Sequence, residues 1–200
     1  MKRIDKLERK FGRYAIQNLM TYIVMLNALV YVLMMIPGSN LRSRLVLNPD
    51  LVLKGEIWRL ITYVFIPPAS SPIFIFFVLY FYYMIGSNLE AEWGSFRFNL
   101  YYLLGMIGTT IAIFITGGEA TPVYINLSLF LAFAHLYPDF QVLLFFIIPV
   151  RMKYLALLNW IFIGISILFE PIPYKVAAIV SVLNFLLFFG PDIIDDIKFR

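Results

Sequence analysis

Ser128 and His135 lie in the same apolar segment, and their side chains are of the types used in nucleophilic catalysis. A serine hydroxyl is a weak nucleophile unless a base lies within about 2.6–3.2 Å of it. On one straight helix these residues share a face but lie about 10 Å apart along the axis, at roughly 1.5 Å per residue. They therefore cannot form a catalytic pair. We expect His135 to hydrogen-bond with Asp139, four residues later, or simply to be solvated.

The composition excludes several other kinds of site. The chain has no cysteine, which rules out thiol nucleophiles, disulfides and cysteine metal sites. A single histidine rules out a histidine-rich metal centre within one chain, and no motif predicts a cofactor. The net charge of +4 would suit nucleic acid, but the Lys and Arg are spread along the chain outside a basic N-terminal segment. A membrane-proximal tail explains that segment, so we expect no nucleic-acid partner.

The elements that carry these residues are apolar enough to cross a lipid bilayer. Hydrophobic residues make up 62% of the chain and charged residues 14%, whereas soluble domains carry about 25% charged residues. A span needs about 20 mainly apolar residues. Three candidates are short, which is tolerated where protein surrounds them or the bilayer thins. The six candidate spans cover residues 15–36, 71–89, 98–115, 123–137, 154–169 and 176–189.

Six spans place both chain ends on one side of the membrane. With both termini in the cytoplasm, the inner segments hold most of the Lys and Arg, as the positive-inside rule requires. We expect a basic cytoplasmic tail over 1–14, a membrane domain over 15–190 and a cytoplasmic tail over 191–200. The first apolar run is too long for a cleaved signal, whose apolar region has about 7–15 residues. The lack of a cleaved signal and of an added soluble domain favours a prokaryotic plasma membrane.

Two further apolar runs, 58–66 and 140–150, are too short to span and suit interfacial or re-entrant segments. The first of these ends the connection over 37–70. A connection of that length is uncommon without a function. It contains Trp58 and Arg59, which suit the headgroup level, so we expect the loop to be anchored against the outer leaflet.

A second polar block lies between the second and third candidate spans. It contains Glu90, Gly94 and Arg97. An ion pair between Glu90 and Arg97 across a turn at Gly94 would pin the ends of two helices. Solvated, unpaired charges are the alternative.

These two blocks, in this order and spacing, resemble the rhomboid superfamily. Rhomboids have a Trp-Arg pair before the second span and a Glu-x-x-x-Gly-x-x-Arg-Phe block between the second and third, and both occur here. The stretch 132–150 is similar to the region after the rhomboid catalytic helix. The run 48–50 adds Derlin-like features. The resemblance covers 15–190 and implies an all-α bundle of six transmembrane helices.

The resemblance fails at the catalytic residues. Rhomboid proteases use a serine of span four, within Gly-x-Ser-Gly, and a histidine of span six. Aligning the helices on the resemblance puts Val123 at the nucleophile position and Ser181 at the base position. Neither histidine nor asparagine, the usual oxyanion helpers of span two, occurs between Pro67 and Gly86. We therefore expect the chain not to be an enzyme.

Small residues four apart occur in both central helices: Ser128 and Ala132 in span four, and Ala177 and Ser181 in span six. Such pairs let helix backbones approach closely in lipid. We expect these spans to pack face to face, with Val123 and Ser181 lining a site without chemistry. Packing of these small residues against other helices is the alternative.

The function that the resemblance implies is that of a pseudoprotease, which binds transmembrane helices of client proteins without cleaving them. A client helix would enter from the bilayer beside spans two and five. Buried amides would either hold the bundle or contact the client; they are Asn27, Asn126, Asn159 and Asn184. The alternatives are an active intramembrane serine protease and a small transporter or channel. His135 is the one ionisable side chain that could face a central pathway, which argues against ion coupling. No feature predicts an oligomeric state.

Overall fold

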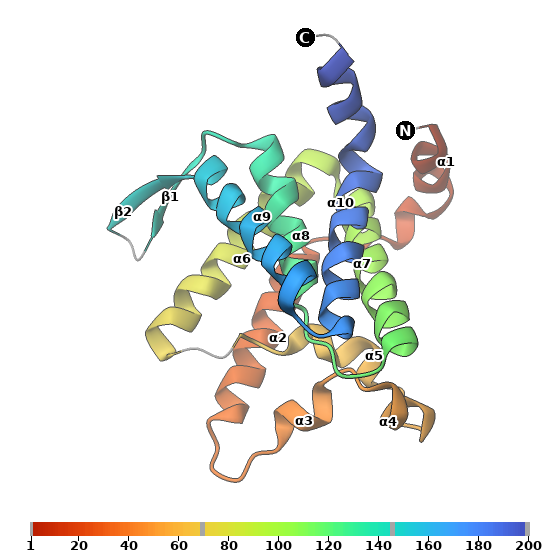
Figure 1. Ribbon diagram of the computed structural model, residues 1–200, viewed down its shortest axis with the longest axis vertical. Helices are drawn as coiled ribbons and strands as arrows, with labels where there is room; N and C mark the ends of the chain where they lie inside the picture. Colours follow the sequence, from red (N-terminus) through yellow and green to blue (C-terminus); the bar gives the residue numbers. More distant parts are fainter. Residues whose placement is uncertain (1, 69–70, 145–146, 199–200) are drawn as a thin grey trace. The chain divides into compact units, whose positions relative to one another are not determined.

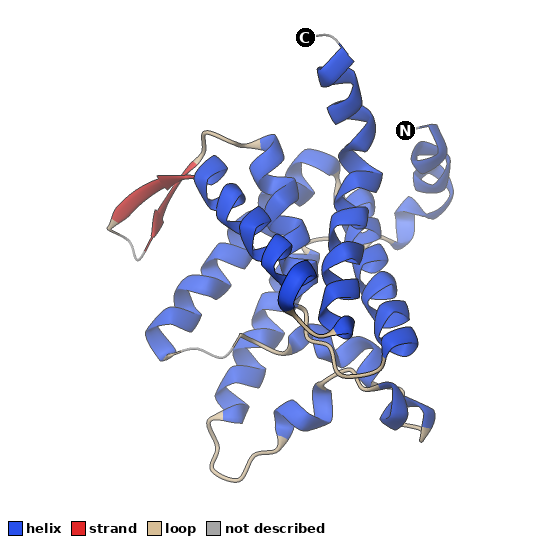
Figure 2. Ribbon diagram, in the orientation of Figure 1, coloured by secondary structure: helices blue, strands red, loops and turns tan. Residues whose placement is uncertain are grey.

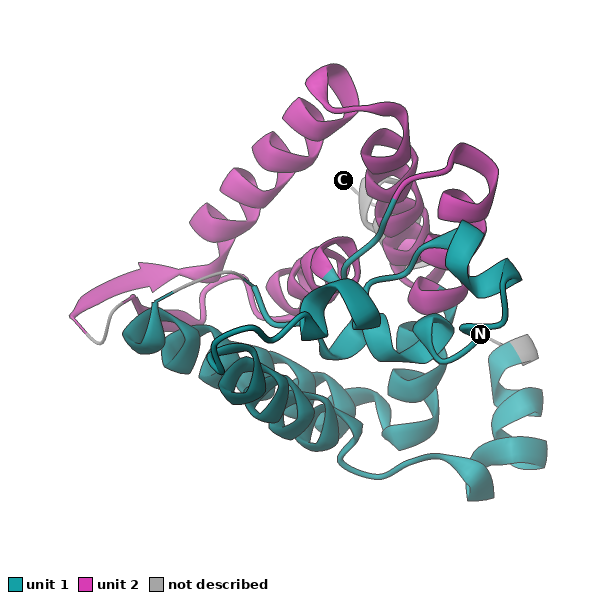
Figure 3. Cartoon of the chain, turned by 90° about the horizontal axis from the view of Figure 1, so that it is seen from below, with its two compact units in different colours: residues 1–104, 119–122 teal, residues 105–118, 123–200 magenta. Residues whose placement is uncertain are grey.

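A computed structural model describes residues 2–68, 71–144 and 147–198, and it is helical apart from one short hairpin (Figures 1 and 2). The chain forms two compact units, coloured in Figure 3. The first contains residues 1–104 and 119–122, and the second contains 105–118 and 123–200. The helices that correspond to the six expected segments are α2 (Leu19–Met34), α6 (Pro72–Trp93), α7 (Ser95–Thr116), α8 (Val123–Leu136), α9 (Met152–Phe169) and α10 (Ile172–Lys198).

In the first unit, α2 packs along α6. Gly86 of α6 permits this approach, because a Cβ atom at this position would lie 2.5 Å from the Met20 Cβ. Helix α6 begins at Ser71, whose hydroxyl accepts a hydrogen bond from the Phe74 amide, with Pro72 in the first turn. It ends at Gly94, whose φ of +82° few other residues adopt.

The connection between α2 and α6 is folded. It contains α3 (Leu41–Leu45), α4 (Pro49–Leu53), α5 (Arg59–Thr62) and the short 3₁₀ helix η2 (Tyr63–Phe65). Its core is apolar, with Leu47 and Tyr63 fully buried. Leu47 also forms an antiparallel bridge with Ala120. The described part of this loop therefore has its own core.

In the second unit, α8 packs against α9 and α10. A hairpin follows α8, in which β1 (Gln141–Leu144) pairs antiparallel with β2 (Ile148–Arg151). The purely helical expectation missed this hairpin. Its alternating exposure distinguishes it from a helix, since only Val142 of β1 is buried. Residues 145–146 of the expected interfacial run lie outside the described residues.

Each of the six expected segments coincides with a helix, but the count of six spans is not confirmed. Among the described residues, four helices are long and apolar enough to cross a membrane: α6, α7, α9 and residues 172–190 of α10. Helix α8 has only 14 residues. Helix α2 has 16 and counts as a fifth span only when joined to the segment Ile4–Tyr14, from which it is bent by 59°. The multi-pass character is supported.

The expected tails are also largely helical. The N-terminal tail forms α1 (Lys2–Phe11) and the 3₁₀ helix η1 (Gly12–Tyr14). At the other end, α10 continues to Lys198 through most of the expected tail, and residues 199–200 lie outside the described residues.

Candidate functional site

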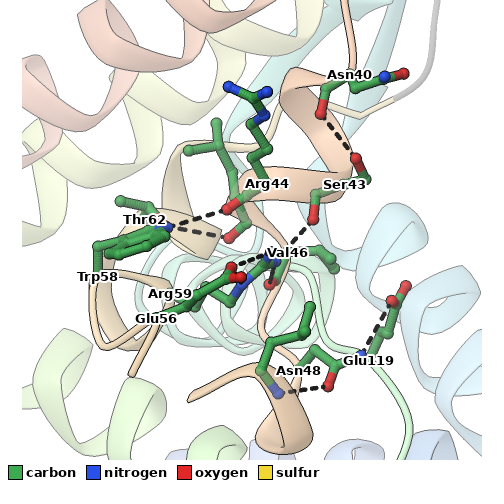
Figure 4. A network of polar contacts seen from close by, with 12 residues as sticks. Asn40, Ser43, Arg44, Val46, Asn48, Glu56, Trp58, Arg59, Thr62 and Glu119 are labelled. Carbon is green, nitrogen blue, oxygen red and sulfur yellow. Dashed lines mark hydrogen bonds and ion pairs between the residues drawn. The ribbon is translucent and has the colours of Figure 1, made fainter. Parts of the chain in front are cut away.

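Arg59 lies at the centre of a network of polar contacts in the loop between α2 and α6 (Figure 4). It contacts Ser43, Val46 and Glu56, and we call this network the Arg59 knot. Its side chain is only 4% exposed. Nη1 donates to the carbonyl oxygens of Ser43 and Val46, at 2.7 and 2.8 Å. Nε and Nη2 both contact Glu56 Oε2, at 2.7 and 2.6 Å. One guanidinium thus joins α3, the following turn and the start of α5.

Neighbouring side chains close the same loop. Trp58 Nε1 donates to the Arg44 carbonyl at 3.3 Å, and the Thr62 hydroxyl donates to the Leu45 carbonyl at 3.2 Å. Trp58 is half exposed and suits the headgroup level. The expected anchoring of Arg59 to lipid is wrong, because its donors are used by buried carbonyls and by Glu56.

The same loop is tied to the segment that follows α7. Asn48 caps α4, its Oδ1 accepting a hydrogen bond from the Leu51 amide at 3.3 Å. Its Nδ2 donates to Glu119 Oε1 at 3.4 Å. Asn48 therefore has a capping role, which explains the short Asn-Pro-Asp run without a ligand.

Side chains near the turn between α6 and α7 hold the bent connection between η1 and α2, residues 15–18, which we call the elbow. Glu90 Oε1 accepts hydrogen bonds from the Asn18 amide at 2.7 Å and the Ser95 hydroxyl at 2.6 Å. Asn99 pairs with the backbone of Ile16, accepting from its amide at 3.2 Å and donating to its carbonyl at 2.8 Å. The elbow is therefore held at two positions, Ile16 and Asn18.

Arg97 is directed to α1. It forms ion pairs with Asp5 at 2.8 Å and with Glu8 at 3.2 Å. The expected ion pair between Glu90 and Arg97 is wrong. Arg97 binds the two carboxylates of α1, whereas Glu90 binds Asn18 and Ser95. Gly94 provides the expected turn.

The sequence-based prediction missed Asn99, Asn18 and the acidic residues of α1 as partners in this elbow. The available signal was the run of polar residues that begins the third span, Ser95 to Asn99. Its partners are main-chain groups and residues about 80 to 90 positions away, and helical spacing gives no indication of such distant contacts.

In the second unit, Ser128 of α8 faces Ser181 of α10. The Ser128 hydroxyl donates to the Ser181 carbonyl at 3.0 Å, and the Ser181 hydroxyl donates to the Ala178 carbonyl at 2.7 Å. Ala132 and Ala177 are also buried. Val123 begins α8, about 7.5 Å before Ser128 along the helix axis. Ser128, rather than Val123, is therefore the residue of α8 that lies against Ser181.

The ionisable residues near the end of α8 have other partners than expected. The His135 ring lies edge-on to Phe185 and Phe189, with centroids 5.9 and 4.8 Å away. Asp139 pairs instead with Lys153 at 2.9 Å and Arg151 at 3.4 Å. The hydrogen bond from Lys153, then its charge, lowers the pKa of Asp139. The expected bond between His135 and Asp139 is therefore wrong.

Two of the expected amides bond across elements. Asn27 Nδ2 donates to the Val64 carbonyl at 3.3 Å and to Ile23 of its own helix at 2.8 Å. Asn159 Nδ2 joins α9 to the Leu127 carbonyl of α8 at 3.1 Å. Asn184 lies against Gly105, where an added Cβ would be 3.3 Å from its Nδ2. Oδ1 of Asn126 is buried with no hydrogen-bond partner.

Among the side chains that the structure describes, those of residues 4–68, 71–144 and 147–190, no three His, Asp or Glu cluster as metal ligands would. The polar side chains described above bind carbonyls, amides and one another. They can fix the loop and the elbow. The Ser95 hydroxyl contacts a carboxylate, that of Glu90, which also accepts from the Asn18 amide, and none of these contacts pairs a serine hydroxyl with His135.

Comparison with known proteins places part of the chain in a described family. Residues 17–118 match the family model described as eukaryotic integral membrane protein (DUF1751). The match contains both the Arg59 knot and the turn at Gly94. No curated protein matches the chain. The expected prokaryotic plasma membrane is wrong, because the family is described as eukaryotic. The match covers just over half of the 200 residues, so the chain belongs to the DUF1751 family of eukaryotic integral membrane proteins.

Proposed function

We propose that this membrane protein is a rhomboid-like pseudoprotease that binds transmembrane helices of client proteins and does not cleave them. The exposed face of α9 is the observation that carries the proposal. Of the four candidate spans, α9 is the least buried, at 22% of its apolar window. Helix α6, the other expected entry position, follows at 28%.

The apolar face of α9 has the shape of a helix-docking surface. It presents a continuous row of exposed aliphatic side chains at helical spacing: Leu157, Leu158, Ile161, Ile165 and Leu168. Gly164 lies beside this row, and a Cβ added there meets no atom within 4 Å. Small residues let a second helix backbone approach closely in lipid. Gly164 therefore gives the row a point of close approach.

The serine contacts support binding without cleavage. The hydroxyl protons of Ser128 and Ser181 are both directed to main-chain carbonyl oxygens. A carbonyl oxygen cannot remove a proton from serine, and an activated serine requires a neighbouring base. His135 is the single histidine of the chain, and it contacts two phenylalanine rings.

The test uses the full chain in lipid nanodiscs. Since the chain has no cysteine, Phe169→Cys gives one labelling position for a fluorescence donor at the exposed end of α9, outside the aliphatic row. Acceptor-labelled single-span peptides serve as probes, one all-leucine and one with a glycine at its centre. We expect energy transfer with the glycine peptide, and Gly164→Leu should weaken binding at least tenfold, about 1.4 kcal/mol.

Gly190→Leu is the matched control, because Gly190 is a second helical glycine with open space at its Cβ position. This variant should bind as the parent does. Mass spectrometry of the peptides tests cleavage separately. New peptide termini would show an active protease and overturn the absence of catalysis. Equal binding by the parent and by Gly164→Leu would overturn docking on α9.

A further inference from the structure

The first helix divides its charged and apolar residues into three separate faces. Successive residues of an α-helix turn by about 100°. On this basis the basic residues form one face and the apolar residues the next. Asp5 and Glu8 occupy the third. The exposed members of the first two faces are Lys6, Arg9, Lys10 and Arg13, followed by Leu7, Phe11 and Tyr14.

The acidic face is the one that docks on the protein. Arg97 binds Asp5 at 2.8 Å and Glu8 at 3.2 Å, so the single positive charge of this α7 residue offsets part of the negative charge of the two carboxylates. The basic and apolar faces are left exposed. Leu7 is 43% exposed, Phe11 42% and Tyr14 66%. The docked helix therefore presents a surface that is more positive than its sequence alone suggests.

The segment formed by α1 and η1 is joined through a bend to the apolar helix α2. Helix α1 with η1 meets α2 at a bend of 59°. Asn18 makes the bend with a φ of +54°, and its amide is held by Glu90. Helix α2 carries no charged residue. The bend of 59° turns α1 away from the direction of α2.

We propose that α1 and η1 bind the surface of a bilayer that contains anionic lipids. The basic face contacts headgroup phosphates, and Leu7, Phe11 and Tyr14 enter the interface. Adjacent basic and apolar faces are the pattern of interfacial helices. Charge complementarity selects anionic lipid. The short connection over residues 12–18 keeps α1 close to the apolar helix that follows. The ion pairs with Arg97 set which face meets the lipid.

The test measures how deeply position 7 enters the bilayer. Leu7→Cys in the full chain carries an environment-sensitive fluorophore, since no other cysteine competes for the label. The protein is reconstituted into phosphatidylcholine vesicles, with or without a third of the lipid replaced by phosphatidylserine. We expect a blue shift and protection from an aqueous quencher only with phosphatidylserine. High salt should reverse both, because it screens the charges.

A charge-neutral variant tests the basic face. Each basic residue near an anionic surface contributes about fivefold to binding. Lys6→Gln with Lys10→Gln should therefore weaken the insertion equilibrium roughly 25-fold. The matched control is Arg42→Gln with Lys54→Gln, which removes the same charge from exposed loop positions and should have no effect.

Three outcomes would overturn the proposal. The first is equal probe exposure in both lipid compositions. The second is an unchanged equilibrium in the α1 variant. The third is protection that appears only when an acidic polypeptide is added, which would identify a protein partner instead of lipid. None of these outcomes bears on client binding, which is measured at α9.

Discussion

Replacing Arg59 by methionine tests whether the loop between α2 and α6 is held by one buried guanidinium. Methionine keeps much of the apolar stem and removes all the donors. The carbonyl oxygens of Ser43 and Val46 then lose bonds of 2.7 and 2.8 Å. Hydrogen bonds to a charged group contribute about 1.5–3 kcal/mol each. The two together predict a loss of about 3–6 kcal/mol.

The ion pair with Glu56 adds little to this figure. The Glu56 side chain is 34% exposed, so water can solvate its carboxylate when Arg59 is removed. Partly exposed pairs contribute about 0–1 kcal/mol. Arg59→Lys should therefore be an intermediate case, because its single ammonium keeps the charge but cannot reproduce the planar fork.

The assay is equilibrium unfolding of the purified protein in mixed detergent micelles, with limited proteolysis of the loop as a local measurement. Arg59→Met should lower the free energy of unfolding by about 3–6 kcal/mol and expose 41–62 to protease. Arg42→Met, an exposed arginine of the same loop, should stay close to the parent. A loss below about 1 kcal/mol for Arg59→Met would refute the knot as the element that holds the loop.

Three further predictions concern other contacts. Ser181→Leu should strongly lower the melting temperature in detergent, because the residue is 5% exposed against α8, whereas Ser181→Ala should have a small effect. Gly86→Ala should separate α2 from α6 by collision with Met20, detected as a loss of about 1–3 kcal/mol in unfolding. The lowered pKa of Asp139 makes its contact with Lys153 favourable above the ordinary carboxyl pKa and lost as pH falls through the lowered value. Asp139→Asn should remove this pH dependence of thermal stability.

Hydropathy was sufficient to locate every long helix, because lipid requires about 20 apolar residues whatever their order. It was not sufficient to count spans. The run 15–36 contains the break at Asn18, whose amide needs a partner from another helix. The hairpin β1–β2 was missed for a similar reason, since a short apolar run is compatible with either a strand or a buried helix.

The structure gives Arg59 and Arg97 partners that were not predicted. Arg59 binds main-chain carbonyls, and such groups occur at every position, so no residue type marks them. Arg97 binds Asp5, which lies 92 positions away, and no local spacing indicates that contact. The neighbour of Ser181 depends on the register between α8 and α10. A shift of five residues replaces Val123 by Ser128.

The contacts of Arg59 and Arg97 explain why the two sequence blocks that contain them give little information about catalysis. Both blocks lie within residues 17–118, the part that matches the DUF1751 family. Their side chains hold a loop and an elbow by contacts to carbonyls and carboxylates. Helices α8, α9 and α10, which contain Ser128, Ser181 and the exposed face of α9, lie outside the matched part. The contacts within residues 17–118 therefore do not decide whether α8 to α10 are catalytic. Chemistry and client binding must therefore be measured on the residues of α8 to α10 themselves.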